Sequence, residues 1–381
     1  MFSPTIIKRF IILLVIVGSA TLLAGLLSNT NNITLRLAQE IIPIKKIKKK
    51  VPLTALVPNL PHQEFPTLTP PKEVNAFYIT ASSALTPRSI NHILNVIENS
   101  AANAAVVNVK ESNGIVLTPK IAKLVKRLRA NNIYPIARIV LFQDNELAKE
   151  RPEFALKDEE GELWGKGGYR FIDPSNKKVW DYNIAVANEA LDIGFAEINF
   201  DYVRFPDGYV DDIVYPFYKY DRLKKDVINE AVEYINGKIR EKYPEAIISL
   251  DIFAYAFLRT HDVGIGQKLT DLADHYDVIA PMIYPSHYGP GNFGFENPAE
   301  HPYQVALQTL QHGINQLKAA NKEVIIRPWI QDFDMGAVYD KEKIQQQIKA
   351  IKDAGLNSGW MVWNPSNFYI QDEFAFSEEN Q

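Results

Sequence analysis

The chain of 381 residues contains no cysteine. This absence excludes disulfide bonds, thiolate catalysis and zinc sites built from cysteine ligands. The formal net charge is only −4, so the composition gives no electrostatic basis for binding nucleic acid. With 46% hydrophobic and 23% charged residues, the chain has the composition of a folded globular protein rather than a disordered one.

The motifs of several common catalytic classes are also missing. None of the seven histidines belongs to a His-x-x-x-His or His-Glu-x-x-His pair, and the pair His261-Asp262 fits a loop with ordinary hydrogen bonds. No Gly-x-Ser-x-Gly motif supports a serine nucleophile. The run Gly264-Ile265-Gly266 lacks the third glycine of a dinucleotide-binding fingerprint and indicates a turn. We therefore expect no metal and no cofactor.

The N-terminal segment is apolar enough to anchor the protein in a membrane. Residues 10–27 carry no charge and follow Lys8 and Arg9. As a helix they span roughly 27 Å, close to the thickness of a bilayer's hydrocarbon core. The run is longer than a usual signal-peptide core and no Ala-x-Ala site follows, which favours an uncleaved anchor over a cleaved signal peptide. Lys8 and Arg9 favour a cytoplasmic N-terminus, whereas the lysine cluster at 45–50, on the other side of the apolar run, favours the opposite orientation. We expect residues 1–28 to span the cell membrane once, with the catalytic domain extracytoplasmic.

Residues 29–71 have the composition of a linker. The lysines at 45–50 suit contact with anionic lipid. Prolines then recur between residues 52 and 71, which predicts a stiff, extended tether that contributes nothing to the core of the following domain.

From residue 72 to about residue 368, strand and helix patterns alternate, and residues 369–381 form a C-terminal tail. Strands are predicted at residues 74–80, 104–110, 134–142, 247–253, 278–284, 324–330 and 359–363, and a further strand begins the stretch 196–208, which ends at a Pro-Asp-Gly turn. Eight βα units in about 295 residues are the count and size of a (β/α)₈ TIM barrel. The rival, a doubly wound open sheet, lacks its glycine fingerprint here. A long insertion at 143–173 is a candidate lid.

Polar side chains recur where the predicted strands end. Asp201 lies deep in an apolar strand, on the same face as Glu197 and Asn199, and Asp251 lies on one face of the next strand. Because active sites of TIM barrels form at the carboxyl ends of the strands, these acids are predicted to meet at the barrel mouth. The alternative is that Asp201 only caps a turn or pairs with Arg204. The other polar residues predicted at strand ends are Lys110, Glu111, Arg138, Arg204, Tyr284, His287, Arg327, Trp329, Gln331, Trp363 and Asn364.

Two carboxylates in a cleft with aromatic walls suit hydrolysis of a glycosidic bond, which needs one protonated acid and one ionised carboxylate. Nearby arginines would keep Asp201 charged, so Asp201 is the predicted nucleophile or stabiliser. Asp251 is the first candidate for the acid and Glu111 the second. Each candidate aromatic residue also fits ordinary packing. The residues predicted to bind substrate are Lys110, Arg138, Tyr202, Arg204, Tyr284, His287, Tyr288, Arg327, Trp329, Gln331, Trp363 and Asn364.

Three separated motifs carry a resemblance to a known family. They are Phe200-Asp201-Tyr202-Val203-Arg204-Phe205-Pro206, Pro281-Met282-Ile283-Tyr284-Pro285-Ser286-His287-Tyr288 and Arg327-Pro328-Trp329-Ile330-Gln331. Together they resemble the hallmarks of a bacterial family of glycoside hydrolase domains of unassigned activity, over about residues 72–368. The resemblance implies a TIM barrel, a carbohydrate substrate and often a membrane or secreted location, and it assigns no catalytic residues.

The sequence therefore predicts a membrane-anchored glycoside hydrolase that cleaves a cell-wall or extracellular polysaccharide by a two-carboxylate mechanism, with no nucleic-acid partner. The alternative is a noncatalytic glycan-binding barrel that tethers or senses envelope polysaccharide. Both explain an aromatic rim. Only the enzyme requires two carboxylates at a working separation, about 5–5.5 Å for retention of configuration or about 6.5–9.5 Å for inversion.

Overall fold

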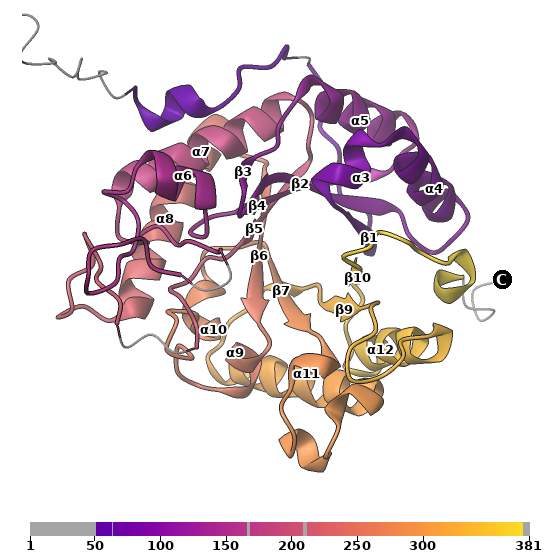
Figure 1. Ribbon diagram of the computed structural model, residues 1–381. Coiled ribbons are helices and arrows are strands. Elements are labelled where there is room, and N and C mark those ends of the chain that lie inside the picture. Colours follow the sequence, from indigo (N-terminus) through magenta and orange to yellow (C-terminus); the bar gives the residue numbers. More distant parts are fainter. Residues whose placement is uncertain (1–50, 63, 166–167, 209–211, 376–381) are drawn as a thin grey trace, which may run out of the picture. The chain divides into compact units, whose positions relative to one another are not determined.

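The computed structural model describes residues 51–62, 64–165, 168–208 and 212–375 (Figure 1). The predicted anchor, residues 1–28, and the lysine cluster at 45–50 lie outside these residues. Among the residues that are described, no helix combines the length and the apolar character needed to cross a bilayer. The chain from Pro52 onward forms a single unit.

Parallel strands at eight positions close into a barrel. In order around the wall they are β1 (Val74–Ile79), β2 (Ala104–Glu111), β4 (Tyr134–Val140), β5 (Glu197–Asp201), β6 (Ile247–Phe253), β7 (Val278–Ile283), β8 (Ile325–Ile326) with β9 (Trp329–Gln331), and β10 (Gly359–Trp363). Strand β1 pairs with both β10 and β2, which closes the sheet. A short strand, β3 (Gly114–Ile115), folds back antiparallel on β2. The predicted (β/α)₈ TIM barrel is confirmed.

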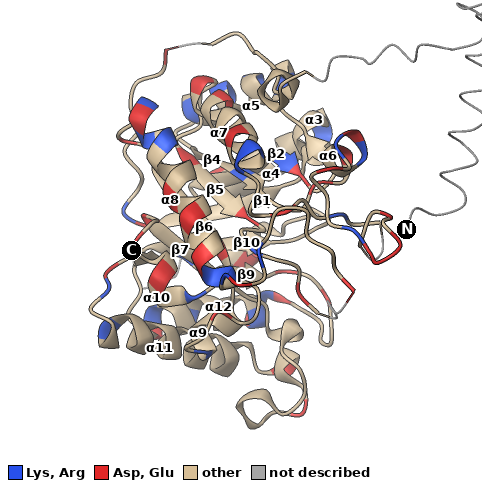
Figure 2. Ribbon diagram, turned by 90° about the vertical axis from the view of Figure 1, so that its left-hand side faces the viewer, with Lys and Arg blue, Asp and Glu red and all other residues tan. Residues whose placement is uncertain are grey.

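Helices cover the outside of the barrel (Figure 1). They are α3 (Ala81–Leu85), α4 (Pro87–Glu98), α5 (Pro119–Ala130), α6 (Asn145–Glu150), α7 (Lys177–Asp192), α8 (Lys224–Lys242), α9 (Tyr255–Leu258), α10 (Leu269–Leu272), α11 (Pro302–Ala319) and α12 (Lys341–Asp353). Helix α5 begins where its sequence favours a helix start. The Thr118 side chain caps the helix by accepting a hydrogen bond from the Ile121 N–H, and a proline occupies the first turn. Lysines and arginines of α5 face outward, and charges of both signs cover the outer helices (Figure 2). Short 3₁₀ turns are η1 (Leu53–Leu56), η2 (Pro285–His287), η3 (Asn292–Gly294), η4 (Pro298–Glu300) and η5 (Gln371–Phe374).

The core has two parts because the strands are buried on both faces. Side chains that point outward, such as Ile198, Phe200 and Leu250, pack against the helices in one large cluster. A smaller apolar cluster, which includes Ala76 and Met361, fills the inside of the barrel. The rest of the interior is polar, and this polar part positions the candidate site.

The seventh strand differs from its prediction. Residues 324–330 were expected as one strand, but the structure breaks it into β8 and β9 at Arg327-Pro328. Pro328 has no backbone N–H to donate to a neighbouring strand, so the ladder is interrupted there. The Pro328 carbonyl still accepts from Met361 N at 2.8 Å, and β9 re-pairs with β7 and β10.

Residues 52–62 and 64–68, named here the N-terminal arm, pack on the barrel domain. Leu53 and Leu60 are buried, and η1 contacts α7. The ring of Phe65 lies so close to Gly194 that a Cβ atom there would come within 2.5 Å of it. The prediction of a tether that contributes nothing to the core therefore does not hold for the arm. Apolar residues that lie between the prolines pack on the barrel domain one by one. They follow no helical or strand periodicity, so the sequence pattern did not indicate these contacts.

We expect deletion of the arm to destabilise the barrel. A chain that starts at residue 72 should unfold several degrees below a chain that starts at residue 52, because full burial of each leucine contributes about 1.5–3 kcal/mol, partly offset by the entropy lost in ordering the arm. Thermal unfolding followed by circular dichroism measures the difference. Equal melting temperatures for the two chains would show that the arm is a passive tether.

Candidate active site

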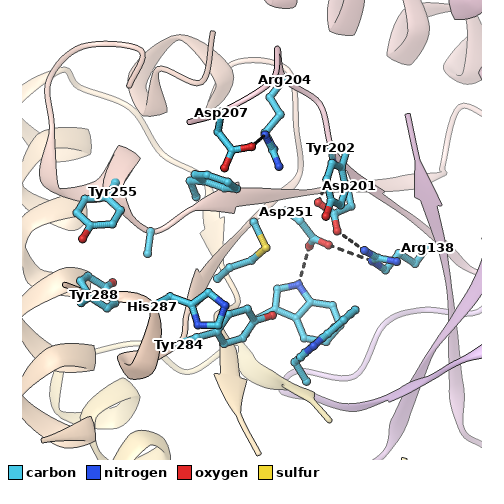
Figure 3. A pocket seen from close by; sticks show the side chains of 15 residues that line it. Arg138, Asp201, Tyr202, Arg204, Asp207, Asp251, Tyr255, Tyr284, His287 and Tyr288 are labelled. Atoms are coloured by element: carbon cyan, nitrogen blue, oxygen red, sulfur yellow. Dashed lines mark hydrogen bonds and ion pairs between the residues drawn. The ribbon is translucent and has the colours of Figure 1, made fainter. Parts of the chain in front are cut away.

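Two acidic residues lie side by side at the carboxyl ends of neighbouring strands. Strands β5 and β6 pair with Phe200 opposite Leu250, so the next residues, Asp201 and Asp251, share one level of the barrel. Both side chains reach toward Arg138 of β4 (Figure 3). The alternation of strand side chains therefore brings the two predicted acids together at the predicted end of the barrel.

One guanidinium group contacts both acids. Nη2 of Arg138 donates to Oδ2 of Asp201, and its Nε lies 3.7 Å from Oδ2 of Asp251. Nη1 donates to Oδ1 of Asn108 at 3.0 Å, and the Trp363 ring lies 5.1 Å away. Burial alone would lower the pKa of Arg138, but the neighbouring Asp201, Tyr78 and Asp251 raise it overall. The guanidinium is thus a fixed positive charge at the centre of the cluster.

Asp251 is buried in a hydrogen-bonded niche. Its Oδ1 accepts from Trp329 Nε1 at 2.6 Å and from Asn199 Nδ2 at 2.8 Å. Only 1% of the residue is exposed. Burial, together with the charge of Asp201, raises the pKa of Asp251 to about 8. The raised pKa favours the protonated form of Asp251 at neutral pH.

Asp201 ends its strand at a strained turn. Its Oδ1 accepts from the backbone N–H of Tyr202 at 2.6 Å, and Tyr202 has a φ of 53°, a left-handed conformation that is uncommon for a bulky residue. The turn brings the Tyr202 ring into the pocket wall, 4.6 Å from the Arg204 guanidinium. Regular strand alternation would put Tyr202 on the opposite face from Asp201. The alternation ends one residue earlier, at Asp201.

The acids line a cavity of about 530 Å³, within the usual range for small-molecule sites. The predicted site residues that line it are Arg138, Asp201, Tyr202, Arg204, Asp251, Tyr284, His287, Tyr288, Trp329 and Trp363. Burial lowers the pKa of His287, so this imidazole is neutral at physiological pH. The Tyr288 hydroxyl is engaged by Thr309 at 2.9 Å. These walls offer flat aromatic faces close to the two carboxyl groups.

Two predicted substrate contacts lie elsewhere. Lys110 follows an irregularity in the pairing of β2 with β4, and it lies between the barrel and α7, 3.0 Å from Asp144. Arg327 forms a buried ion pair with Glu197, at 2.9 Å, where β5 begins. Glu197 is two residues below Asn199 on the inward face, so this pair is at the amino end of the barrel. Neither position supports contact with a substrate in the cavity.

Three more predicted site residues lie beside the cavity without lining it. Glu111 accepts from Asn108 Nδ2 at 2.6 Å and from the N–H of Ala81. Gln331 accepts from Ser286, and Asn364 donates to Asp332 at 3.0 Å. Glu111 thus supports Asn108, a partner of Arg138, whereas Gln331 and Asn364 hold loops at the mouth.

Several cavity residues were absent from the prediction. Asn108 does not line the cavity, but it bridges the cavity residue Arg138 and Tyr78, and its regular pairing opposite Arg138 makes its inward position recognisable from strand alternation. Asp207 pairs with Arg204 at 2.6 Å; in the sequence it belongs to Pro206-Asp207-Gly208, a pattern that indicates a turn. The remaining additions to the cavity wall are Phe253, Ala254, Tyr255 and Met282. Phe253 was recognisable, because it shares a strand face with Asp251.

The insertion at 143–173, predicted as a lid, contributes no residue to the cavity wall among those that the structure describes. Instead, Phe171 packs behind Tyr202, with ring centroids 6.3 Å apart, and near the Arg204 guanidinium. The insertion therefore backs one wall of the cavity.

A TIM barrel with acidic, basic and aromatic residues around a cavity at its carboxyl end is the architecture of many glycosidases. Residues 76–369 match the family described as "Putative glycosyl hydrolase domain", and the chain belongs to this family. This confirms the resemblance found in the three sequence motifs. No match to the chain was found among curated proteins.

Two solved structures of α-galactosidases show the same fold. An α-galactosidase from Thermus thermophilus in complex with p-nitrophenyl α-D-galactopyranoside has a TM-score of 0.52 and 13% identity, over 81% of this chain and 61% of that one. A family 36 α-galactosidase from Geobacillus stearothermophilus has a TM-score of 0.50 and 9% identity, over 79% of this chain and 40% of that one. The chain thus spans less than two thirds of either enzyme. A hypothetical protein from Ruminiclostridium thermocellum is 30% identical, with a TM-score of 0.41, over 46% of this chain and 96% of that one.

Proposed function

We propose that the protein is a membrane-anchored glycoside hydrolase that cleaves O-glycosidic bonds by a two-carboxylate mechanism, with Asp251 as the general acid and Asp201 as the nucleophile or electrostatic stabiliser. The observation that carries this proposal is the pair of carboxyl groups on one guanidinium. Arg138 holds Asp201 in an ion pair, whereas burial keeps a proton on Asp251. Two acids in contrasting environments are what glycosidic hydrolysis requires.

In the proposed reaction, Asp251 donates its proton to the glycosidic oxygen as the bond to the anomeric carbon breaks. The carboxylate of Asp201 stabilises the positive charge that develops on the sugar ring, or attacks the anomeric carbon directly. Water then supplies the hydroxyl group of the new reducing end, and Asp251 recovers a proton from that water. The hydrogen bond from Tyr202 N–H and the ion pair with Arg138 orient Asp201 for this role.

The cavity favours a neutral sugar. Of the two arginines in its described lining, Arg138 faces Asp201 and Asp251, and Arg204 faces Asp207. Both cations are therefore matched by carboxylates rather than left for a uronate or sulfate group. Indole and phenol faces, including Tyr284 and Trp363, suit the apolar faces of sugar rings. The apolar N-terminal run supports an extracytoplasmic barrel, and hence a cell-wall or extracellular polysaccharide as substrate.

The position of Glu111 predicts a small catalytic effect. We expect Glu111→Gln to lower turnover by less than about tenfold, because the side chain supports Asn108 and does not line the cavity. Turnover of the variant on the wild-type substrate measures this. A loss as large as that of an Asp251 variant would return Glu111 to the role of acid.

A glycan panel tests the proposal. Purified wall and capsule polysaccharides, neutral and anionic, are incubated with the full chain, and new reducing ends are counted. The proposal predicts new reducing ends from at least one neutral glycan. Retention of a glycan without cleavage anywhere in the panel would instead favour the noncatalytic glycan-binding barrel.

A further inference from the structure

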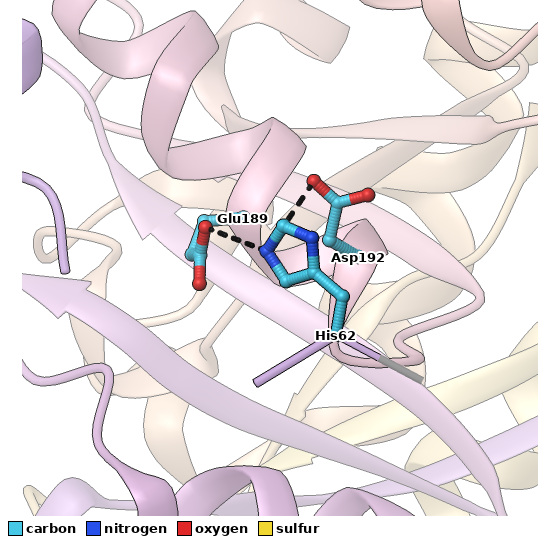
Figure 4. Close-up of side chains that lie close together, drawn as sticks. All are labelled: His62, Glu189 and Asp192. Atoms are coloured by element: carbon cyan, nitrogen blue, oxygen red, sulfur yellow. Dashed lines mark hydrogen bonds and ion pairs between the residues drawn. The ribbon is translucent and has the colours of Figure 1, made fainter. Parts of the chain in front are cut away.

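Three side chains that can bind a metal ion meet at the opposite end of the barrel from the cavity. His62 belongs to the N-terminal arm, and Glu189 and Asp192 lie one turn apart at the C-terminal end of α7 (Figure 4). Because α7 leads directly into the start of β5, this cluster is at the amino end of the strands. Asp201 lies at the other end of the same strand. The cluster is therefore independent of the proposed catalytic acids.

The spacing of the three side chains fits a small divalent ion. Nε2 of His62 lies 3.3 Å from Oε2 of Glu189 and 3.8 Å from Oδ2 of Asp192, and the ligand atoms lie within 4.8 Å of one another. Ligands at about 2.0–2.2 Å in a tetrahedron around Zn²⁺ are about 3.3–3.6 Å apart. Small side-chain rotations would bring all three atoms to those distances.

The carboxylates are also held in place from behind. The backbone N–H of Leu60 donates to Oε1 of Glu189 at 2.6 Å, and the hydroxyl of Tyr243 donates to Oδ1 of Asp192. In each carboxylate the other oxygen faces the imidazole of His62. Such outer hydrogen bonds orient the ligands of many metal sites.

We propose that His62, Glu189 and Asp192 bind a divalent transition-metal ion of the Zn²⁺ type, which fastens the N-terminal arm to α7. One imidazole with two carboxylates suits Zn²⁺, whereas Mg²⁺ and Ca²⁺ prefer sites built from oxygen alone. His62 is 46% exposed in its side chain, which gives the ion a path of entry and leaves a fourth position for water. The sequence showed no metal motif because His62 is 127 residues from Glu189.

The alternative is that the same cluster is an ion-pair network that binds no metal, and this alternative makes different predictions. His62 pairs with Glu189, and Lys242 Nζ lies 2.8 Å from Oδ2 of Asp192, so the charges already have partners. The lysine side chain is half exposed, and its ammonium group also lies 4.8 Å from the centre of the Tyr243 ring, so it can turn from Asp192 toward that ring or into solvent when an ion binds. Lys242 therefore competes with the metal for one ligand oxygen.

The test is calorimetric titration of ZnCl₂ into the tag-free full chain after treatment with chelator. We expect a single site, weakened in His62→Ala by more than the 10–100-fold that loss of an outer hydrogen bond typically costs. His312→Ala removes an exposed histidine of α11 and should bind Zn²⁺ as the wild type does. Glu189→Gln serves as the second ligand variant if His62→Ala unfolds. Equal affinity in the wild type and both ligand variants, or no binding, would overturn the proposal.

Lys242→Ala separates the two explanations. If the cluster is a metal site, removal of the competing ammonium group should tighten Zn²⁺ binding severalfold, and saturating Zn²⁺ should raise the melting temperature by a few degrees in the wild type but not in His62→Ala. If the cluster is only an ion-pair network, Lys242→Ala leaves Zn²⁺ affinity unchanged and Zn²⁺ moves neither melting temperature. An excess of Mg²⁺ should not displace the ion.

Discussion

Replacement of Asp201 by Asn is expected to lower hydrolysis on the order of 10³-fold or more, while affinity for the glycan stays within a few fold. Asparagine keeps the shape of the side chain and can still accept from Tyr202 N–H and Arg138. It removes the negative charge that would stabilise or attack the anomeric carbon. Turnover and glycan affinity are measured on the same preparation.

The matched control for Asp201 is Asp207, which is also paired with an arginine in the same cavity. Asp207 is about half exposed in its side chain and lies away from the Arg138 cluster, so Asp207→Asn should lower turnover by less than about tenfold. If Asp201 were only a structural partner of Arg138, Asp201→Asn would lower the melting temperature and spare turnover. That outcome would remove Asp201 from the reaction.

Replacement of Asp251 by Asn should affect substrates unequally. A glycan with an ordinary sugar leaving group needs a proton on the glycosidic oxygen, so turnover should fall about 10²–10⁴-fold, the usual contribution of a general acid. An aryl glycoside with a very acidic leaving group needs no proton and should be cleaved at a rate close to that of the wild type. Equal losses on both substrates would mean that Asp251 is not the proton donor.

The raised pKa of Asp251 also sets two pH dependences. Turnover of the wild type should fall as pH rises through about 8, where Asp251 loses its proton. The same group also makes the free energy of unfolding depend on pH, because between pH about 3.9 and about 8 the folded state retains a proton that the unfolded state releases. Its contribution to stability is therefore fully present below the unfolded pKa of about 3.9 and is lost as pH rises to about 8. Asparagine cannot titrate, so Asp251→Asn should unfold with a shallower pH dependence in this window. An unchanged dependence would contradict the assignment.

The fold and the positions of the two central acids of the site were predictable from local patterns. A period of two places Asp201 and Asp251 on inward faces, and parallel strands bring their carboxyl ends to one mouth. Arg138 follows by the same reasoning, since it pairs with Asn199 on the neighbouring strand. These residues are regular members of regular strands, so sequence spacing translates directly into position.

The failures occur where the backbone departs from regularity. The irregularity that follows Asn108 in β2 turns Lys110 away from the cavity, so its predicted contact with substrate is wrong. Arg327 was assigned to the mouth because its strand was read as continuous through Pro328. The N-terminal arm was missed because its contacts are set by tertiary packing, which no local pattern records.

The central claim, that the cavity hydrolyses glycosidic bonds, is tested most directly by the fate of water oxygen. The wild-type chain is incubated with a cleaved glycan in H₂¹⁸O, and the products are weighed by mass spectrometry, with brief reaction times to limit exchange at the reducing end. The account predicts one ¹⁸O at the new reducing end for each bond broken and no label above background with Asp201→Asn. Products that carry a double bond and no ¹⁸O would show elimination rather than hydrolysis, and would contradict the account.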